Sequence, residues 1–131
     1  MNRFRTYLHV HGNRFDPHAF RATLPDKVAG TVNPFYRVKD GVKTVVGHYW
    51  TSTVTTPSTT GVEDELLRLL RKYSRHLIRA RKSPSTRMYA VIAADMDDIE
   101  TLRGYFISKA LIQALFKHGV ELDISIVGRR P

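Results

Sequence analysis

The chain has 131 residues, a length at which one domain can bury a hydrophobic core, and we expect a single domain over residues 1–131. It contains no cysteine, which excludes disulfides, thiolate zinc sites and cysteine nucleophiles. Its 21 Lys and Arg against 12 Asp and Glu give a net charge of +9, which serves solubility and also favours anionic partners. The sequence has no apolar signal core and no membrane-length apolar run, so we expect a cytoplasmic protein without membrane insertion.

The first residues predict a strand followed by a short helix. Over Arg3–His11 apolar and polar side chains alternate, which is typical of a half-buried strand. Asp16 and Pro17 are a common N-cap and first helical residue, so a helix is expected to begin there. Phe20 and Leu24 are its expected buried contacts.

The next segments predict a β hairpin and its packing anchor. Residues 26–44 favour a strand interrupted at positions 33–34, and the Asp-Gly pair at 40–41 indicates a hairpin turn. Val42–Val54 is rich in branched and aromatic residues and predicts a strand. Trp50, the only tryptophan, is expected to be buried.

Residues 60–82 predict one long amphipathic helix. Thr60 is expected to cap it, with Glu63 as the capping-box partner. Its expected buried face repeats at helical spacing and consists of Leu66, Leu69, Leu70, Tyr73 and Leu77. On the other side the pattern gives a basic row about 21 Å long. This row is the first candidate surface for an acidic partner or an anion: Arg68, Arg71, Lys72, Arg75, Arg79 and Lys82.

The C-terminal part predicts two more strands and two helical segments. Arg87–Ala94 is apolar on both faces and predicts a central strand. A short helical turn is expected over Asp97–Leu102, and a helix over Ser108–His118 that ends at Gly119. Val120–Val127 alternates again and predicts the last strand.

A strand–helix–strand unit used twice predicts an α+β, ferredoxin-like two-layer sandwich, with a mostly antiparallel sheet and helices on one face. Side chains alternate across a sheet, so the residues expected under the helices are Leu8, Val10, Leu122, Ile124 and Ile126. The opposite face is expected to be polar and open, and it is the second candidate surface: Tyr7, His9, His11 and Asp123, with Ser125 beside them.

The order of these signals resembles a bacterial domain-of-unknown-function family, number 4279. The segments that carry the resemblance are YLHVHGNRFDPHAFRATLP, HYWTSTV, VEDELLRLL and YFISKALIQALFKHGVELDISIV. The matching positions are Phe15, Asp16, Pro17, Trp50, Leu115 and Gly119. The resemblance implies a similar length and order of elements, and it implies no catalytic residue.

Two clusters have the residue types of a metal site. His9 and His11 lie on one face of a predicted strand, and His48 or Asp123 is the candidate third ligand. The acidic residues of 95–100 lack the glycine and the length of a calcium loop, so we interpret them as a helix start. We therefore expect no bound metal and no cofactor.

No nucleophile elbow, P-loop or dinucleotide fingerprint is present in the sequence. The leading hypothesis is therefore a non-enzymatic binding module whose basic surface recognises an acidic protein, for example an immunity or antitoxin-like protein. The alternatives are sequence-nonspecific nucleic-acid binding, and an enzyme or metal protein that uses the histidine face. A homodimer is an open alternative.

Overall fold

The computed structural model describes residues 3–25, 29–54, 61–96 and 107–128. These residues form an α+β fold in which a five-stranded, mostly antiparallel sheet is combined with four helices. The strands are β1 (Arg3–Gly12), β2 (Thr31–Lys39), β3 (Val42–Thr51), β4 (Thr86–Met96) and β5 (Glu121–Gly128). The helices are α1 (Pro17–Thr23), α2 (Val62–Lys72), α3 (Ser74–Ala80) and α4 (Lys109–His118).

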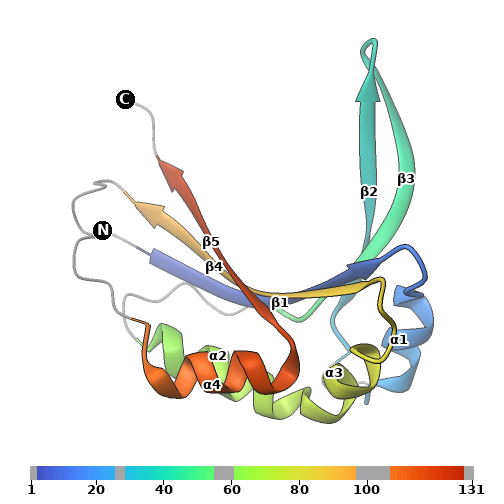
Figure 1. Ribbon diagram of the computed structural model, residues 1–131. Helices are drawn as coiled ribbons and strands as arrows, with labels where there is room; N and C mark the ends of the chain where they lie inside the picture. Colours follow the sequence, from blue (N-terminus) through green and yellow to red (C-terminus); the bar gives the residue numbers. More distant parts are fainter. Residues whose placement is uncertain (1–2, 26–28, 55–60, 97–106, 129–131) are drawn as a thin grey trace.

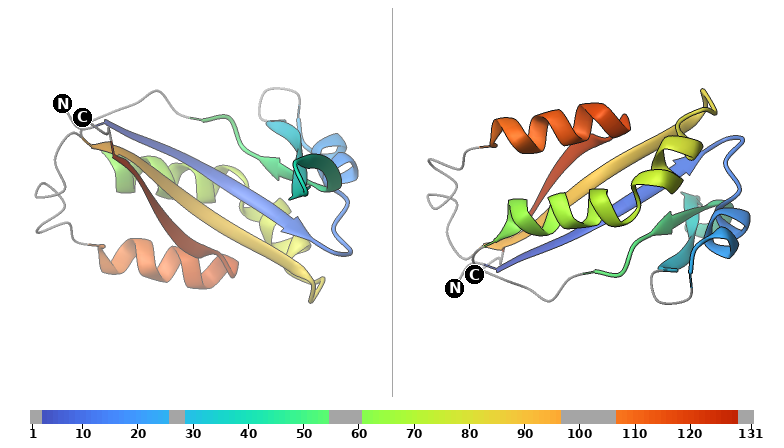
Figure 2. Two further views of the ribbon diagram at one scale, coloured as in Figure 1. Left: turned by 90° about the horizontal axis from the view of Figure 1, so that it is seen from above. Right: turned by 90° about the horizontal axis from the view of Figure 1, so that it is seen from below.

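The strand order in the sheet is β2-β3-β1-β4-β5. All neighbours are antiparallel except β4 and β5, which are parallel and joined through α4. Helices α2, α3 and α4 lie on one side of the sheet, and the β2–β3 hairpin rises on the other side (Figure 1). Figure 2 shows the same two layers from above and below. No described helix covers the upper face.

The β1–α1 region confirms the sequence prediction. Asp16 caps α1, because its Oδ1 accepts hydrogen bonds from the backbone N–H groups of His18 and Ala19. Pro17 is the first helical residue, and Phe20 is buried with Leu24, which follows the helix end. The cap is local chemistry between neighbouring residues, so the sequence alone indicated it.

The β2–β3 hairpin differs from the expected interrupted strand. β2 runs through Asn33 and Pro34 without a break, because it is an edge strand in which a missing proline N–H removes no necessary hydrogen bond. Asp40 and Gly41 form the turn with φ values of 52° and 75°, as the sequence predicted. An irregularity in pairing occurs between Phe35 and Tyr36.

The prediction of one continuous helix over residues 60–82 is wrong. It is divided at Tyr73, whose φ of −101° and ψ of 7° leave the helical region and separate α2 from α3. The break turns the Tyr73 ring toward Trp50, with 5.2 Å between ring centroids. It also lets the Ser74 hydroxyl donate a hydrogen bond to Nε2 of His118 over 2.7 Å. Tertiary contacts therefore override a local helical pattern.

The start of α2 differs from the prediction in its N-cap residue. Gly61 occupies the N-cap position of α2 with a left-handed φ of 74°, and among the described residues no side chain makes a capping hydrogen bond there. Glu63 instead accepts a hydrogen bond from the backbone N–H of Ser108 over 2.6 Å, which joins α2 to the start of α4. Thr60 lies outside the described residues.

The two faces of the sheet follow the predicted alternation. Leu8 and Val10 are buried under the helices, as expected, and Leu122 packs against the core. Ile124 was expected to be covered by the helices, but it is 43% exposed near the end of edge strand β5. The side chain of Ile126 lies outside the described residues.

Helix α4 begins and ends at the predicted signals. Ser108 caps α4 by accepting a hydrogen bond from the Leu111 N–H, and Gly119 ends the helix with φ 67°, as predicted. The turn expected over Asp97–Leu102 lies outside the described residues. Within the described ranges, no helix is long and apolar enough to cross a membrane.

Candidate functional site

Five aromatic rings from four strands meet on the helix-free face of the sheet. We call this group the aromatic cluster: His9, His11, Phe35, Tyr49 and Tyr89. Four of its members are partly buried, and Phe35 is 36% exposed. A sheet face expected to be simply polar is therefore mainly aromatic.

The rings of the aromatic cluster are in mutual contact. His9 and Tyr49 are stacked, with centroids 4.5 Å apart and planes inclined by only 6°. The Phe35 ring lies 4.6 Å from Tyr49 and 5.4 Å from His11. Tyr89 meets both histidines edge-on or tilted, at 5.9 Å from His9 and 5.6 Å from His11. Such contacts stabilise a fixed arrangement of rings.

Strand register brings these rings together. His9 of β1 is directly opposite Tyr89 of β4, so their side chains leave the same face. Val10 pairs with Trp50 on the buried face, which places the adjacent Tyr49 on the open one. Phe35 is opposite Gly47, and a glycine partner leaves room for a large ring.

The two histidines of the aromatic cluster are held neutral. Burial and, after it, the neighbouring His11 lower the pKa of His9 to about 4, while Asp123 acts in the opposite direction. Burial and the nearby Arg87 likewise lower the pKa of His11. The His9 Nε2 and His11 Nδ1 atoms are 3.1 Å apart, so one ring donates a hydrogen bond and the other accepts it. At neutral pH the cluster is an uncharged stacking surface.

The lowered pKa of His9 predicts a pH dependence of stability. Because the ordinary value is 6.5 and the folded value is about 4, the unfolded chain takes up this proton first as the pH falls. The contribution is complete above pH 6.5 and is lost between pH 6.5 and about 4. We expect wild-type stability to urea to fall across this window more than that of His9→Gln. An NMR titration of the His9 ring with a midpoint near 6.5 would contradict this account.

Charge is distributed unevenly around the aromatic cluster. Asp123 of β5 is close enough to act on the pKa values of both His9 and Tyr7, and burial together with Asp123 raises the pKa of Tyr7. Arg87 acts on His11 from the start of β4. The open face is thus acidic toward β5 and basic toward the β1–α1 end, which favours an anionic ligand at the latter end.

The predicted basic row lies in the helix layer, on the side of the sheet away from the aromatic cluster. All six of its side chains are exposed: Arg68, Arg71, Lys72, Arg75, Arg79 and Lys82. Arg68 is engaged by Glu65 through an ion pair, and its Nε donates to both carboxylate oxygens over 3.1 Å. The other five cations of the basic row lie outside this ion pair.

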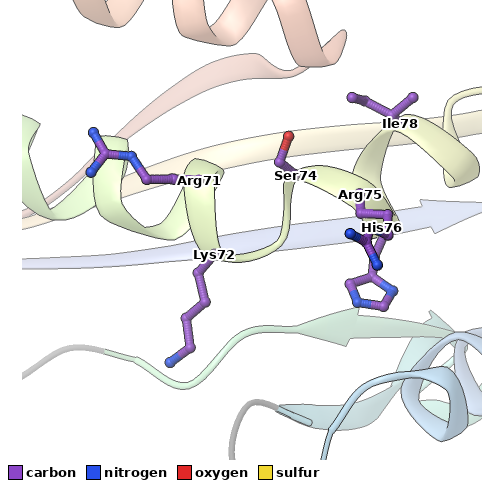
Figure 3. A pocket seen from close by; sticks show the side chains of 6 residues that line it. All are labelled: Arg71, Lys72, Ser74, Arg75, His76 and Ile78. Atoms are coloured by element: carbon purple, nitrogen blue, oxygen red, sulfur yellow. The ribbon is translucent and has the colours of Figure 1, made fainter.

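The break at Tyr73 also changes the shape of the basic row. In Figure 3 the Arg71 and Lys72 side chains leave the helix in different directions, around a shallow pocket of about 630 Å³. His76 lines the same pocket beside Arg75, and burial, followed by the charges of Arg79 and Arg75, lowers its pKa. The straight row expected from one helix is divided into two short groups.

The histidines do not assemble the candidate metal site. His48 lies against His18, with ring centroids 5.5 Å apart, rather than beside His9 and His11. In the part of the chain that the structure describes, no group of three His, Cys, Asp or Glu side chains is placed to hold a metal ion.

Sequence reasoning found Tyr7, His9, His11 and Asp123 on one face, and the structure brings them around one surface. It missed Phe35, Tyr49 and Tyr89. Tyr49 and Tyr89 alternate with the buried residues of their own strands, and this alternation is the sequence signal that could have placed them opposite the core.

No family model, curated protein or solved structure matches this chain, so the resemblance to family 4279 stays a prediction.

Proposed function

We propose that the protein binds single-stranded nucleic acid, with little sequence preference, on the open face of its sheet. The aromatic cluster is the observation that carries the proposal, because bases of any sequence stack on aromatic rings. A helix-free sheet face with exposed aromatic residues is a recurring surface for single-stranded RNA.

Two further features support the proposal. The net charge of +9 attracts a phosphate backbone and accounts for affinity that does not depend on sequence. The neutral histidines extend the stacking surface without requiring a counter-ion at pH 7. A base that stacks on this surface meets rings that the protein has already ordered, such as the stacked pair His9 and Tyr49.

Loss of the tyrosine rings is expected to weaken binding directly. Stacking on one aromatic side chain contributes ~1–3 kcal/mol per base, so Tyr49→Ala and Tyr89→Ala should each raise the Kd about 5- to 150-fold. The measurement is fluorescence anisotropy with a fluorescein-labelled ten-nucleotide oligothymidylate and oligouridylate at low salt.

Matched variants separate stacking from other effects. Tyr49→Phe and Tyr89→Phe keep the rings and should bind like the wild type, and urea unfolding of each variant checks that it is folded. Lys72→Glu, Arg75→Glu and Arg79→Glu together reverse the charge at three of the six positions of the basic row and should leave the stacking contribution unchanged. The proposal fails if wild-type protein does not bind either oligonucleotide at low salt, or if the alanine and phenylalanine variants bind equally.

The basic row supports a second candidate function, recognition of an acidic protein. Its exposed side chains form two groups around the pocket at Arg71 and Arg75, on a face separate from the aromatic cluster. The probe for this candidate is poly-L-glutamate, titrated with the same variants. The wild type and Tyr49→Ala should bind the polymer, and the charge-reversed variant should not.

We also propose a ferredoxin-like core for this fold. The first four strands have the order β2-β3-β1-β4 and the connections β-α-β-β-α-β, which supports a ferredoxin-like core to which α4 and β5 are added. We further propose a non-enzymatic binding protein located in the cytoplasm. The oligonucleotide test does not depend on the fold type, on the absence of catalysis or on the location.

A further inference from the structure

A groove of about 810 Å³ begins at the edge of the aromatic cluster. One wall is the β1–α1 connection and the start of α1, and the other is the β2–β3 hairpin. His11 and Phe35 belong both to the aromatic cluster and to this groove, so the two surfaces are continuous. We call it the hairpin groove.

The hairpin groove is lined by two exposed arginines, one from each wall. Arg14 comes from the β1–α1 connection, and Arg37 comes from β2. Among the described residues neither guanidinium takes part in an ion pair. The one acidic lining residue, Asp16, already accepts two backbone hydrogen bonds as the cap of α1. Two arginines against one carboxylate leave the lining of the groove with a net positive charge.

Both walls are held in place by backbone contacts. The Arg14 N–H donates to Oγ of Ser85 over 3.2 Å, and Gly12 lies so close to the same segment that a Cβ there would be 2.3 Å from the Ser85 carbonyl oxygen. Arg37 is paired with Thr44 across the hairpin. Fixing the backbone at both arginines lowers the ordering cost of binding an anion, which then falls mainly on the two side chains.

We infer that the hairpin groove holds the backbone phosphates of the strand whose bases lie on the aromatic cluster, with Arg14 and Arg37 as the phosphate-binding residues. This inference rests on the proposed function. Asp123 on the β5 side repels a phosphate backbone, and the guanidiniums on the hairpin side attract it. The strand therefore leaves the cluster between His11 and Phe35 and continues toward α1.

The test is the salt dependence of binding to the ten-nucleotide oligothymidylate. For single strands, log K falls with log salt by about 0.7 per phosphate contact, so losing two contacts should lower the slope by about 1.4. We expect this change in the double variant Arg14→Gln, Arg37→Gln. The matched control is Arg75→Gln, Arg79→Gln, which removes the same charge from exposed positions in the helix layer.

The possible outcomes separate this inference from the proposed function. A lower slope in the groove variant and an unchanged slope in the helix variant support it. Equal slopes in the groove variant and the wild type overturn it, as do equal reductions in both variants. If Tyr49→Ala still weakens binding in those cases, the stacking proposal stands while the groove assignment is rejected.

Discussion

Replacing Trp50 with alanine is expected to lower the free energy of unfolding by about 3–5 kcal/mol. Trp50 is fully buried, and its ring packs edge-on against Phe20 at 4.8 Å and Tyr73 at 5.2 Å. Its indole N–H donates a 2.7 Å hydrogen bond to the carbonyl of Ala29. The alanine variant loses the ring contacts and leaves both a cavity and an unpaired carbonyl. Urea unfolding followed by circular dichroism measures the loss.

Two control variants show where the Trp50 effect originates. Trp50→Phe keeps most of the ring but not the N–H, so its loss should be smaller than that of the alanine variant. Phe116 is 85% exposed, and Phe116→Ala should change stability by no more than about 0.5 kcal/mol. A Trp50→Ala variant as stable as Phe116→Ala would contradict the placement of β3 over the core.

Replacing Gly30 with alanine is expected to destabilise the fold by about 2–4 kcal/mol. Gly30 has φ 65°, a left-handed conformation that costs energy for any residue with a Cβ. A Cβ there would also lie 2.2 Å from the Thr51 carbonyl oxygen and 2.9 Å from Nε1 of Trp50. The substitution therefore combines strain with a clash against backbone, and urea unfolding measures the result.

Gly41 provides the matched control for Gly30. Its φ is 75°, but a Cβ at this position has no atom within 4 Å. Gly41→Ala should therefore cost only the conformational term, about 1–2 kcal/mol. Equal losses in the two variants would show that the close approach at Gly30 contributes nothing.

Features of the fold that depend on neighbouring residues were predictable from the sequence. The Asp16 cap, the Asp40–Gly41 turn and the Gly119 helix end each depend on chemistry within a few residues. The break at Tyr73 was not predictable, because the local pattern is that of a continuous helix. It arises from contacts with Trp50 and His118, which are distant in sequence.

The candidate site was predictable only in part, for a similar reason. Alternation along β1 placed Tyr7, His9 and His11 on the open face. Grouping them with Tyr49 and Tyr89 requires the register between strands, which alternation within one strand does not give. The hairpin groove depends further on how β2 and β3 rise beside α1, a feature with no sequence pattern of its own.

The position of β1 in the sheet has a consequence for how the chain folds. This N-terminal strand lies between β3 and β4, and it is opposite β4 along its whole length, from Arg3 with Asp95 to Gly12 with Thr86. During synthesis β1 is made before β4, so it must wait until its main partner exists. Pairings between distant segments slow folding, because the loop-closure entropy is lost before the contacts form. The β2–β3 hairpin is a local pairing that can form earlier, and the sheet is completed only after β4 and then β5 have been made.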